Sequence, residues 1–184
     1  MMKRLCVLIF VLGIQLAQSQ PAEVVIIRHA EEPGGNSVHL SDKGERRAEA
    51  LVSFFTTDAR VTQHGVPVAF FAPRPRPNRS RRSEETLLPT ASSLGLTVRE
   101  PLTEEQYAEL ARRLLRDRSL RGKTVVIAWT HSYIPRLAAA LGVRPAPPAW
   151  KAGVYDRAYV ITFPRGRARL VNVPQRLLPG DSTR

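Results

Sequence analysis

The sequence predicts a three-layer α/β/α sandwich built on a mainly parallel sheet with an antiparallel edge. The first observation is that residues 24–27 and 124–129 form uninterrupted apolar runs, typical of strands buried on both faces of a sheet. The second is that segments with helical periodicity alternate with strand-like segments. A chain of 184 residues that is 43% hydrophobic is long enough for one domain with a substantial core.

Residues 1–19 are expected to be a signal peptide, and residues 20–184 the folded domain. Such a signal has a basic start, a short apolar core and small residues at the −3 and −1 positions of its cleavage site. The chain supplies these features with Lys3 and Arg4, residues 5–14, and Ala17 and Ser19. Ten apolar residues are too few to span a bilayer. We therefore expect an exported protein, periplasmic or secreted, with no membrane span after cleavage; a retained anchor is the alternative.

The first predicted helix follows a loop over residues 31–36, which contains proline and glycine. Its start is predicted at Asp42, because Glu45 stands three residues later as in a capping box. One apolar face then recurs with helical spacing, formed by Ala48, Leu51, Val52 and Phe55.

A second strand is predicted over residues 66–72. The arginine-rich segment 74–82 follows, and its interleaved prolines exclude a helix there. A helix is expected to resume at Ser80 or Ser83. Pro89 should kink this helix or mark a late start.

The second half of the domain repeats the alternation. A short strand over residues 97–102 precedes a helix that Thr103 should cap, with Gln106 completing a capping box. The buried stripe of that helix is formed by Tyr107, Leu110, Ala111, Leu114 and Leu115.

The strand over residues 124–129 leads into a helix with Pro135 in its first turn and Gly142 at its end. Two late strands, residues 158–163 and 168–173, flank a short turn. They predict an antiparallel hairpin at the sheet edge.

Two of the predicted strands end in histidine. The first apolar run continues into Arg28 and His29, and the run over residues 124–129 ends two residues before His131. In open α/β sheets, ligands bind at the carboxyl ends of the strands. We interpret His29 as a nucleophile and Arg28 as a phosphate clamp, because the forked guanidinium matches phosphate geometry.

These landmarks resemble, in the same order, the motifs of the histidine phosphatase superfamily, which has the phosphoglycerate-mutase-like fold. Residues 28–31 resemble its Arg-His-Gly/Ala signature, and residues 40–48 resemble its Leu-Ser/Thr-x-x-Gly-x-x-x-Ala helix entry. Residues 82–86 match its Arg-x-x-x-Thr motif, and residues 125–131 match its second-histidine strand. The resemblance covers residues 24–142.

The resemblance implies phosphoryl transfer that needs no metal and no other cofactor. His29 would attack phosphorus to form a phosphohistidine, which water then hydrolyses. Arg28 and Arg82 would clamp the phosphate oxygens, and a protonated His131 would add positive charge. Asn36, in the loop after the first strand, would bind substrate.

The second arginine has close competitors in the sequence. Arg82 is preferred because Thr86 follows it at the spacing of the motif. The other cations of the same segment are Arg74, Arg76, Arg79 and Arg81.

A poor leaving group needs a proton from a general acid. Many members of the family carry a glutamate between the second arginine and the second histidine, and the resemblance implies Glu104 for this role. The alternative is that Glu104 only favours the first turn of its helix. Glu31 and Glu32 are further candidates. Without a carboxyl in place, the enzyme would favour phosphoramidates or anhydrides.

The charge balance favours an anionic partner, because the formal net charge is +12. We expect a small phosphorylated substrate, and the predicted export argues against nucleic acid. The four histidines lack the spacing of a zinc site. Cys6, the one cysteine, lies in the predicted signal peptide. A second hypothesis is a non-catalytic phosphate or polyanion binder of the same fold.

Overall fold

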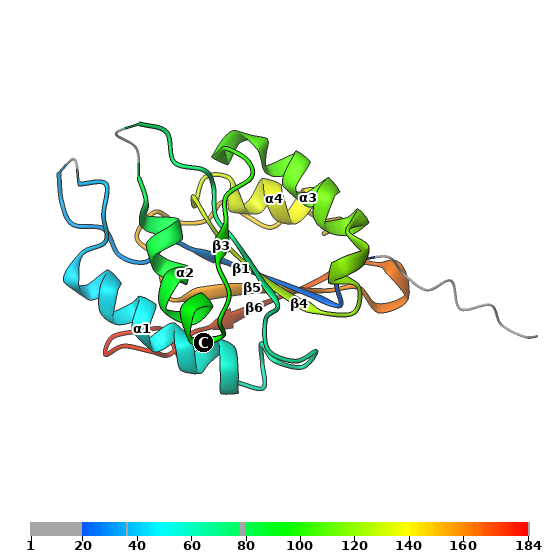
Figure 1. Ribbon diagram of the computed structural model, residues 1–184, viewed down its shortest axis with the longest axis horizontal. Coiled ribbons are helices and arrows are strands. Elements are labelled where there is room, and N and C mark those ends of the chain that lie inside the picture. The colour runs from blue at the N-terminus through cyan, green and yellow to red at the C-terminus, as the bar shows by residue number, and fades with distance from the viewer. Residues whose placement is uncertain (1–19, 36, 78–79, 184) are drawn as a thin grey trace, which may run out of the picture.

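The computed structural model describes residues 20–35, 37–77 and 80–183. It consists of a six-stranded sheet with helices on both faces (Figure 1). In chain order the elements are β1 (Glu23–Arg28), α1 (Asp42–Thr57), β2 (Ala69–Phe71), α2 (Arg82–Ser93), β3 (Val98–Arg99), η1 (Glu104–Gln106), α3 (Tyr107–Arg116), η2 (Arg118–Leu120), β4 (Thr124–Trp129), α4 (Ile134–Ala140), β5 (Arg157–Thr162), η3 (Pro164–Gly166) and β6 (Arg169–Pro174).

The sheet has the strand order β3-β2-β4-β1-β5-β6. The first four of these strands run parallel to one another, and β5 and β6 add an antiparallel edge. The predicted fold class is therefore confirmed. Because β1 and β4 are neighbours in the centre, with Arg28 opposite Trp129, the two histidine-bearing strand ends lie side by side.

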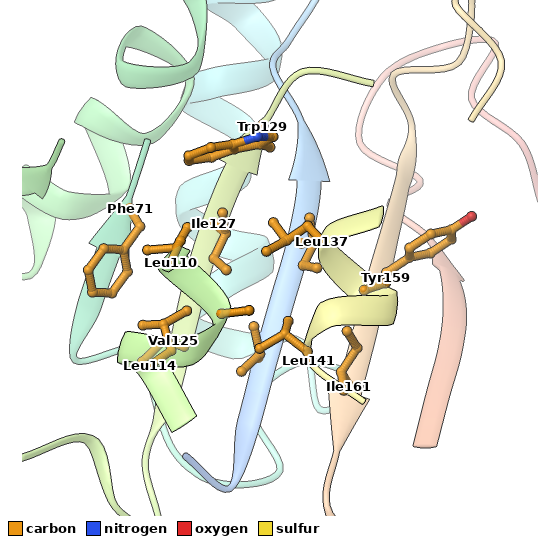
Figure 2. Close-up of a cluster of buried hydrophobic side chains, with 14 of the residues drawn as sticks. Phe71, Leu110, Leu114, Val125, Ile127, Trp129, Leu137, Leu141, Tyr159 and Ile161 are labelled. Carbon is orange, nitrogen blue, oxygen red and sulfur yellow. The ribbon is translucent and has the colours of Figure 1, made fainter. Parts of the chain in front are cut away.

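The central strands are apolar throughout because each face is covered by a pair of helices (Figure 1). Val24 and Ile26 pack with residues of α3 and α4, whereas Val25 and Ile27 pack with residues of α1 and α2. Figure 2 shows the first of these clusters, with Trp129 at the carboxyl end of β4. Burial of one such side chain contributes about 1.5–3 kcal/mol, so the sheet provides a rigid base for residues at its edge.

The first helix is capped differently from the prediction. Ser41, not Asp42, is the N-cap, and its Oγ accepts a hydrogen bond from the backbone nitrogen of Gly44 at 3.1 Å. Asp42 is the first helical residue, where a carboxylate still favours the positive end of the helix dipole. On the inner face Phe54 is buried, while Val52 is only partly so.

Two predicted strands are shorter than expected. The second spans Ala69–Phe71, and Val66 remains 45% exposed before it. The third is the two-residue β3, because only β2 is available to pair with it at this edge. The helix α2 begins at Arg82 and contains Pro89 in its interior, so the proline does not delay the start.

The predicted capping box of Thr103 and Gln106 is confirmed, although it opens a short 3₁₀ turn before α3. The C-terminal hairpin also lies where the sequence predicts it. The predicted signal peptide lies outside the described residues. Within the part of the chain that the structure describes, no helix is long and apolar enough to cross a bilayer.

Candidate active site

The carboxyl ends of the four parallel strands surround a pocket of about 560 Å³. His29 and Thr130 line it from the ends of β1 and β4. Arg74 and Glu104 line it from the segments after β2 and β3, and Arg82 closes it from the first turn of α2. A larger hollow of about 740 Å³, lined from α1 and α2, contains none of the predicted site residues.

His29 is held as a neutral imidazole with one free ring nitrogen. Its Nδ1 lies 2.8 Å from the carbonyl oxygen of Ala30. Because a carbonyl only accepts, Nδ1 carries the proton and Nε2 keeps its lone pair. Burial lowers the pKa of His29 to about 3, and the positive charges of Arg28 and Arg82 act in the same direction. A nucleophile at neutral pH needs this state.

Arg28 is buried beside the nucleophile, and part of its guanidinium is unpaired. Its side chain is almost completely covered, and its Cζ lies 3.9 Å from the ring centroid of Tyr155. One terminal nitrogen, Nη2, donates to Oε1 of Glu32 at 3.0 Å. Within the described residues, Nε and Nη1 are buried without a hydrogen-bond partner. Arg28 does not itself line the pocket, but it retains two donor nitrogens beside the nucleophile.

Arg82 is positioned by the threonine of its own motif. Oγ1 of Thr86 donates to the carbonyl oxygen of Arg82 at 2.6 Å and accepts from the backbone nitrogen of Ala30 at 2.8 Å. This one hydroxyl joins the first turn of α2 to the residue after the nucleophile. The four-residue spacing in the sequence is thus explained by one helical turn.

The two arginines converge on the carboxylate of Glu32. Nη1 of Arg82 pairs with Oε2, while Arg28 and the hydroxyl of Tyr155 both donate to Oε1. Among the described arginines of the 74–82 segment, only Arg82 contacts Glu32. This convergence supports Arg82 as the second clamp.

His131 lies close enough for its charge to act on the pKa of His29. It is half-buried, and its Nδ1 is buried without a hydrogen-bond partner in the described part of the chain. Burial, followed by the nearby charge of Arg28, lowers the pKa of His131 below its ordinary value of 6.5. These surroundings oppose the protonated state expected of His131, which remains a prediction for the site with phosphate bound.

Glu104 is docked against the end of β4. Its Oε2 accepts from Oγ1 of Thr130 at 2.5 Å, and its backbone oxygen accepts from Nε1 of Trp129 at 3.1 Å. Because Glu104 lines the same pocket as His29, it is well placed to act on a leaving group. The structure brings these residues together although 75 positions separate them in the chain.

Glu31 is excluded as the general acid by its contacts. It is buried, and both of its carboxylate oxygens accept from Arg47 at 2.9 Å. Burial alone would raise the pKa of Glu31, but the hydrogen bonds from Arg47 outweigh it and hold the pKa below its ordinary value. Its backbone oxygen also lies 2.3 Å from where a Cβ on Gly44 would sit, so only glycine permits this approach.

Asn36 and Arg79 lie outside the described residues. Sequence reasoning missed Tyr155 as a member of the site and Thr130 as the anchor of Glu104. The sequence contains only a weak signal for Tyr155, which stands just before the fifth strand. Among the residues that the structure describes, no three histidine, cysteine or acidic side chains are grouped so that they could hold a metal ion.

By sequence, the chain matches no protein-family model and no curated protein. By structure, it resembles several solved phosphatases. A provisionally assigned α-ribazole-5'-P phosphatase from Escherichia coli K-12 superposes with a TM-score of 0.59 at 12% identity, covering 86% of this chain and 98% of the other. A phosphoserine phosphatase from Entamoeba histolytica, in complex with 3-phosphoglyceric acid, gives 0.55 at 13% identity, with 85% and 99% covered.

A mycobacterial glucosyl-3-phosphoglycerate phosphatase gives a TM-score of 0.52 at 17% identity, with 82% of this chain and 97% of the other covered. These neighbours are members of the histidine phosphatase superfamily. At such identities the likeness shows the fold. The resemblance predicted from the motifs is thus confirmed at the level of the fold.

Proposed function

We propose that the protein is a phosphatase that hydrolyses small phosphate monoesters through a phosphohistidine on His29. The observation that supports this most is the state of His29, a buried neutral imidazole tethered through Nδ1 beside two convergent arginines. The solved neighbours of the same fold are described as phosphatases, which also supports the proposal.

In the first step, Nε2 of His29 forms a bond to phosphorus while the bond from phosphorus to the leaving oxygen breaks. Arg28 and Arg82 neutralise the charge on the transferred oxygens, which is the main task in phosphoryl transfer. In the second step, water attacks phosphorus, the bond to Nε2 breaks, and inorganic phosphate forms as the water loses a proton. The imidazole returns to its neutral state.

Glu104 is the proposed source of the proton for the leaving oxygen. It lies in the pocket with its side chain anchored by Thr130. In the second step the same carboxylate would accept the proton of the attacking water. Arg74 lines the same pocket.

The test compares the wild-type protein with His29→Ala on p-nitrophenyl phosphate. We expect measurable turnover by the wild-type protein and a loss of at least about 10³-fold in the variant, because the nucleophile is gone. Rapid acid-free quenching with ³²P-labelled substrate should trap label on the wild-type chain. Turnover that survives His29→Ala would overturn the assignment of the nucleophile.

The role of Glu104 is tested with leaving groups of different quality. Glu104→Gln should lower kcat by about 10²-fold or more for an alkyl phosphate but much less for p-nitrophenyl phosphate, whose leaving group needs little protonation. An equal loss on both substrates would contradict a proton-donating role. Turnover of a phosphoramidate alone would point to an enzyme without an acid.

The second hypothesis, a non-catalytic phosphate binder, makes a different prediction in the same assay. It predicts that inorganic phosphate binds but that neither the esters nor the phosphoramidate is hydrolysed. The convergence of two arginines on one anion site would suit such a binder.

We also propose that the protein is exported, on the basis of the basic start and the apolar core of residues 1–19. Sequencing the N-terminus of the protein recovered from a bacterial periplasm would test this. Cleavage close to Gln20 is the expected result. Retention of Met1 on a membrane-bound protein would favour the anchor.

A further inference from the structure

The carboxylate of Glu32 lies in the position of a bound anion. It accepts from Arg28 at 3.0 Å and from the hydroxyl of Tyr155 at 3.2 Å, and it pairs with Arg82. These two arginines are the groups that the proposed function assigns to the phosphate. A carboxylate and a phosphate present similar oxygen pairs to a guanidinium. The carboxylate of Glu32 therefore occupies the position that the phosphate of the substrate would need.

Glu32 leaves several of the surrounding nitrogen atoms without a hydrogen-bond partner. Two nitrogens of Arg28 and Nδ1 of His131 are buried without a hydrogen-bond partner in the described residues. A carboxylate is planar and has two oxygens, whereas a phosphoryl group is tetrahedral and offers three. Buried donors without acceptors are unfavourable. A phosphate dianion therefore suits these donors better, both in the number of its oxygens and in its charge.

Glu32 is more exposed than its neighbour Glu31, so solvent can take up its carboxylate more easily. Its side chain is 36% exposed, whereas that of Glu31 is 10% exposed and held by Arg47. The residues after it are Pro33, Gly34 and Gly35, and Gly35 has a φ of 79°, which favours glycine. A carboxylate that turns toward solvent regains its hydration, which offsets part of the cost of breaking its contacts with Arg28, Arg82 and Tyr155.

Tyr155, which lies in the segment before β5, is a further member of this anion-binding site. Its ring covers the guanidinium of Arg28 at 3.9 Å, and the ring centroid lies 6.1 Å from that of His29. Its hydroxyl donates to the same oxygen of Glu32 as Arg28 does. Once Glu32 has left, this hydroxyl faces the anion that replaces it.

We propose that Glu32 is the resident occupant of the phosphate site, that substrate binds by displacing it, and that Tyr155 then donates its hydroxyl to the phosphate. This inference rests on the proposed function. It makes Tyr155 a substrate-binding residue and Glu32 a selectivity residue. Since a dianion gains more from the two arginines than a carboxylate does, the site selects phosphate monoesters against monoanions such as phosphodiesters.

The test is calorimetric titration with inorganic phosphate at pH 8, which needs no turnover. Glu32→Gln removes the competing charge with little change in shape, so we expect phosphate to bind about tenfold more tightly or better. Tyr155→Phe should weaken binding by about threefold to tenfold in the Glu32→Gln background. In the wild-type background, Tyr155→Phe should weaken phosphate binding by less. The reason is that the competing carboxylate of Glu32 loses its hydrogen bond from Tyr155 as well.

Glu105→Gln is the matched control. Glu105 lines the same pocket but pairs with the exposed Arg76 at 3.0 Å. Removal of its charge should change the dissociation constant for phosphate by less than about twofold, because solvent screens it.

Unchanged or weaker phosphate binding by Glu32→Gln would overturn the inference, since Glu32 would then brace the arginines rather than compete with substrate. The proposed function can fail separately. If no variant hydrolyses an ester but Glu32→Gln still binds phosphate more tightly, Glu32 occupies the phosphate site although the protein is not a phosphatase. If hydrolysis requires His29 but Glu32→Gln binds phosphate no better, the proposed function stands and the inference about Glu32 is wrong.

Discussion

Arg28 and Arg47 are equally buried, each with 2% of its surface exposed, yet their surroundings differ completely. Each is paired with one of two successive glutamates, Glu32 and Glu31. The partners of Arg47 extend to Asp181, so that its terminal nitrogens and Nε all donate to described groups. Arg28 leaves two nitrogens unpaired. A complete set of partners indicates a structural role, and an incomplete set indicates a place for a ligand.

The largest expected effect on stability is at Arg47. Arg47→Met leaves the buried carboxylate of Glu31 with only Lys43 as an ion-pair partner, and that of Asp181 with only backbone N–H groups. We therefore expect a loss of about 3–5 kcal/mol in the free energy of unfolding. Urea unfolding followed by circular dichroism measures it. The folded fraction should keep kcat within about threefold, because Arg47 neither lines the pocket nor acts on the pKa of His29, as Arg28 does. A loss of kcat without a loss of stability would break the contrast between the two arginines.

Arg28→Met is the matched substitution, with the opposite expected outcome. We expect kcat/KM for p-nitrophenyl phosphate to fall by about 10²–10³-fold, because one preorganised donor is lost. The free energy of unfolding should change by less than about 1 kcal/mol, since two buried donors without partners disappear. Strong destabilisation would show that Arg28 is structural after all.

Glu23 tests whether a missing partner is by itself a sign of function. It is fully buried at the opposite end of β1, both its oxygens lack a hydrogen-bond partner in the described residues, and burial raises its pKa to about 7. The folded state therefore favours the protonated form, and stability falls as the pH rises from 4.5 through 7. Glu23→Gln should stabilise the protein at pH 8 by roughly 2–3 kcal/mol.

At pH 4 the same substitution should have almost no effect on stability, because Glu23 is then protonated in both states. Thermal unfolding at the two pH values measures the difference, and kcat at pH 7 serves as the control. A large change in kcat would mean that the unpaired carboxyl contributes to the site at a distance.

The smallest expected effect is at Thr130. Thr130→Val removes the hydroxyl that donates to Glu104 at 2.5 Å. We expect kcat for an alkyl phosphate to fall by about fivefold, in proportion to one hydrogen bond, with the value for p-nitrophenyl phosphate nearly unchanged. The double variant that combines Thr130→Val with Glu104→Gln should have the same kcat as Glu104→Gln alone. An additive loss would separate the threonine from the proposed acid.

The fold was largely predictable from the sequence, because it depends on periodicity. Residues 24–27 and 124–129 are apolar at every position, which indicates burial on both faces and places these strands in the centre of a parallel sheet. The edge strands were predicted too long, since their ends are set by what is available to pair with them. The cap at Ser41 was missed because Asp42 is an equally good capping residue by type.

The site was predictable only in part. His29, Arg28 and Arg82 follow from motifs in which the spacing is local, such as the single helical turn from Arg82 to Thr86. The sequence did not show which of Glu31 and Glu32 pairs with Arg28, because the directions of successive side chains in a loop depend on its tertiary contacts.

By itself, the sequence determined the sheet, the position of both histidines at its carboxyl edge and the basic character of the segment that covers them. Only the tertiary structure decided which glutamate neutralises which arginine. It also brought Tyr155, which lies 126 positions after His29, over the guanidinium of Arg28. The physical reason is that periodicity and motif spacing act within one element, whereas the pairing of buried charges depends on contacts between elements distant in the chain.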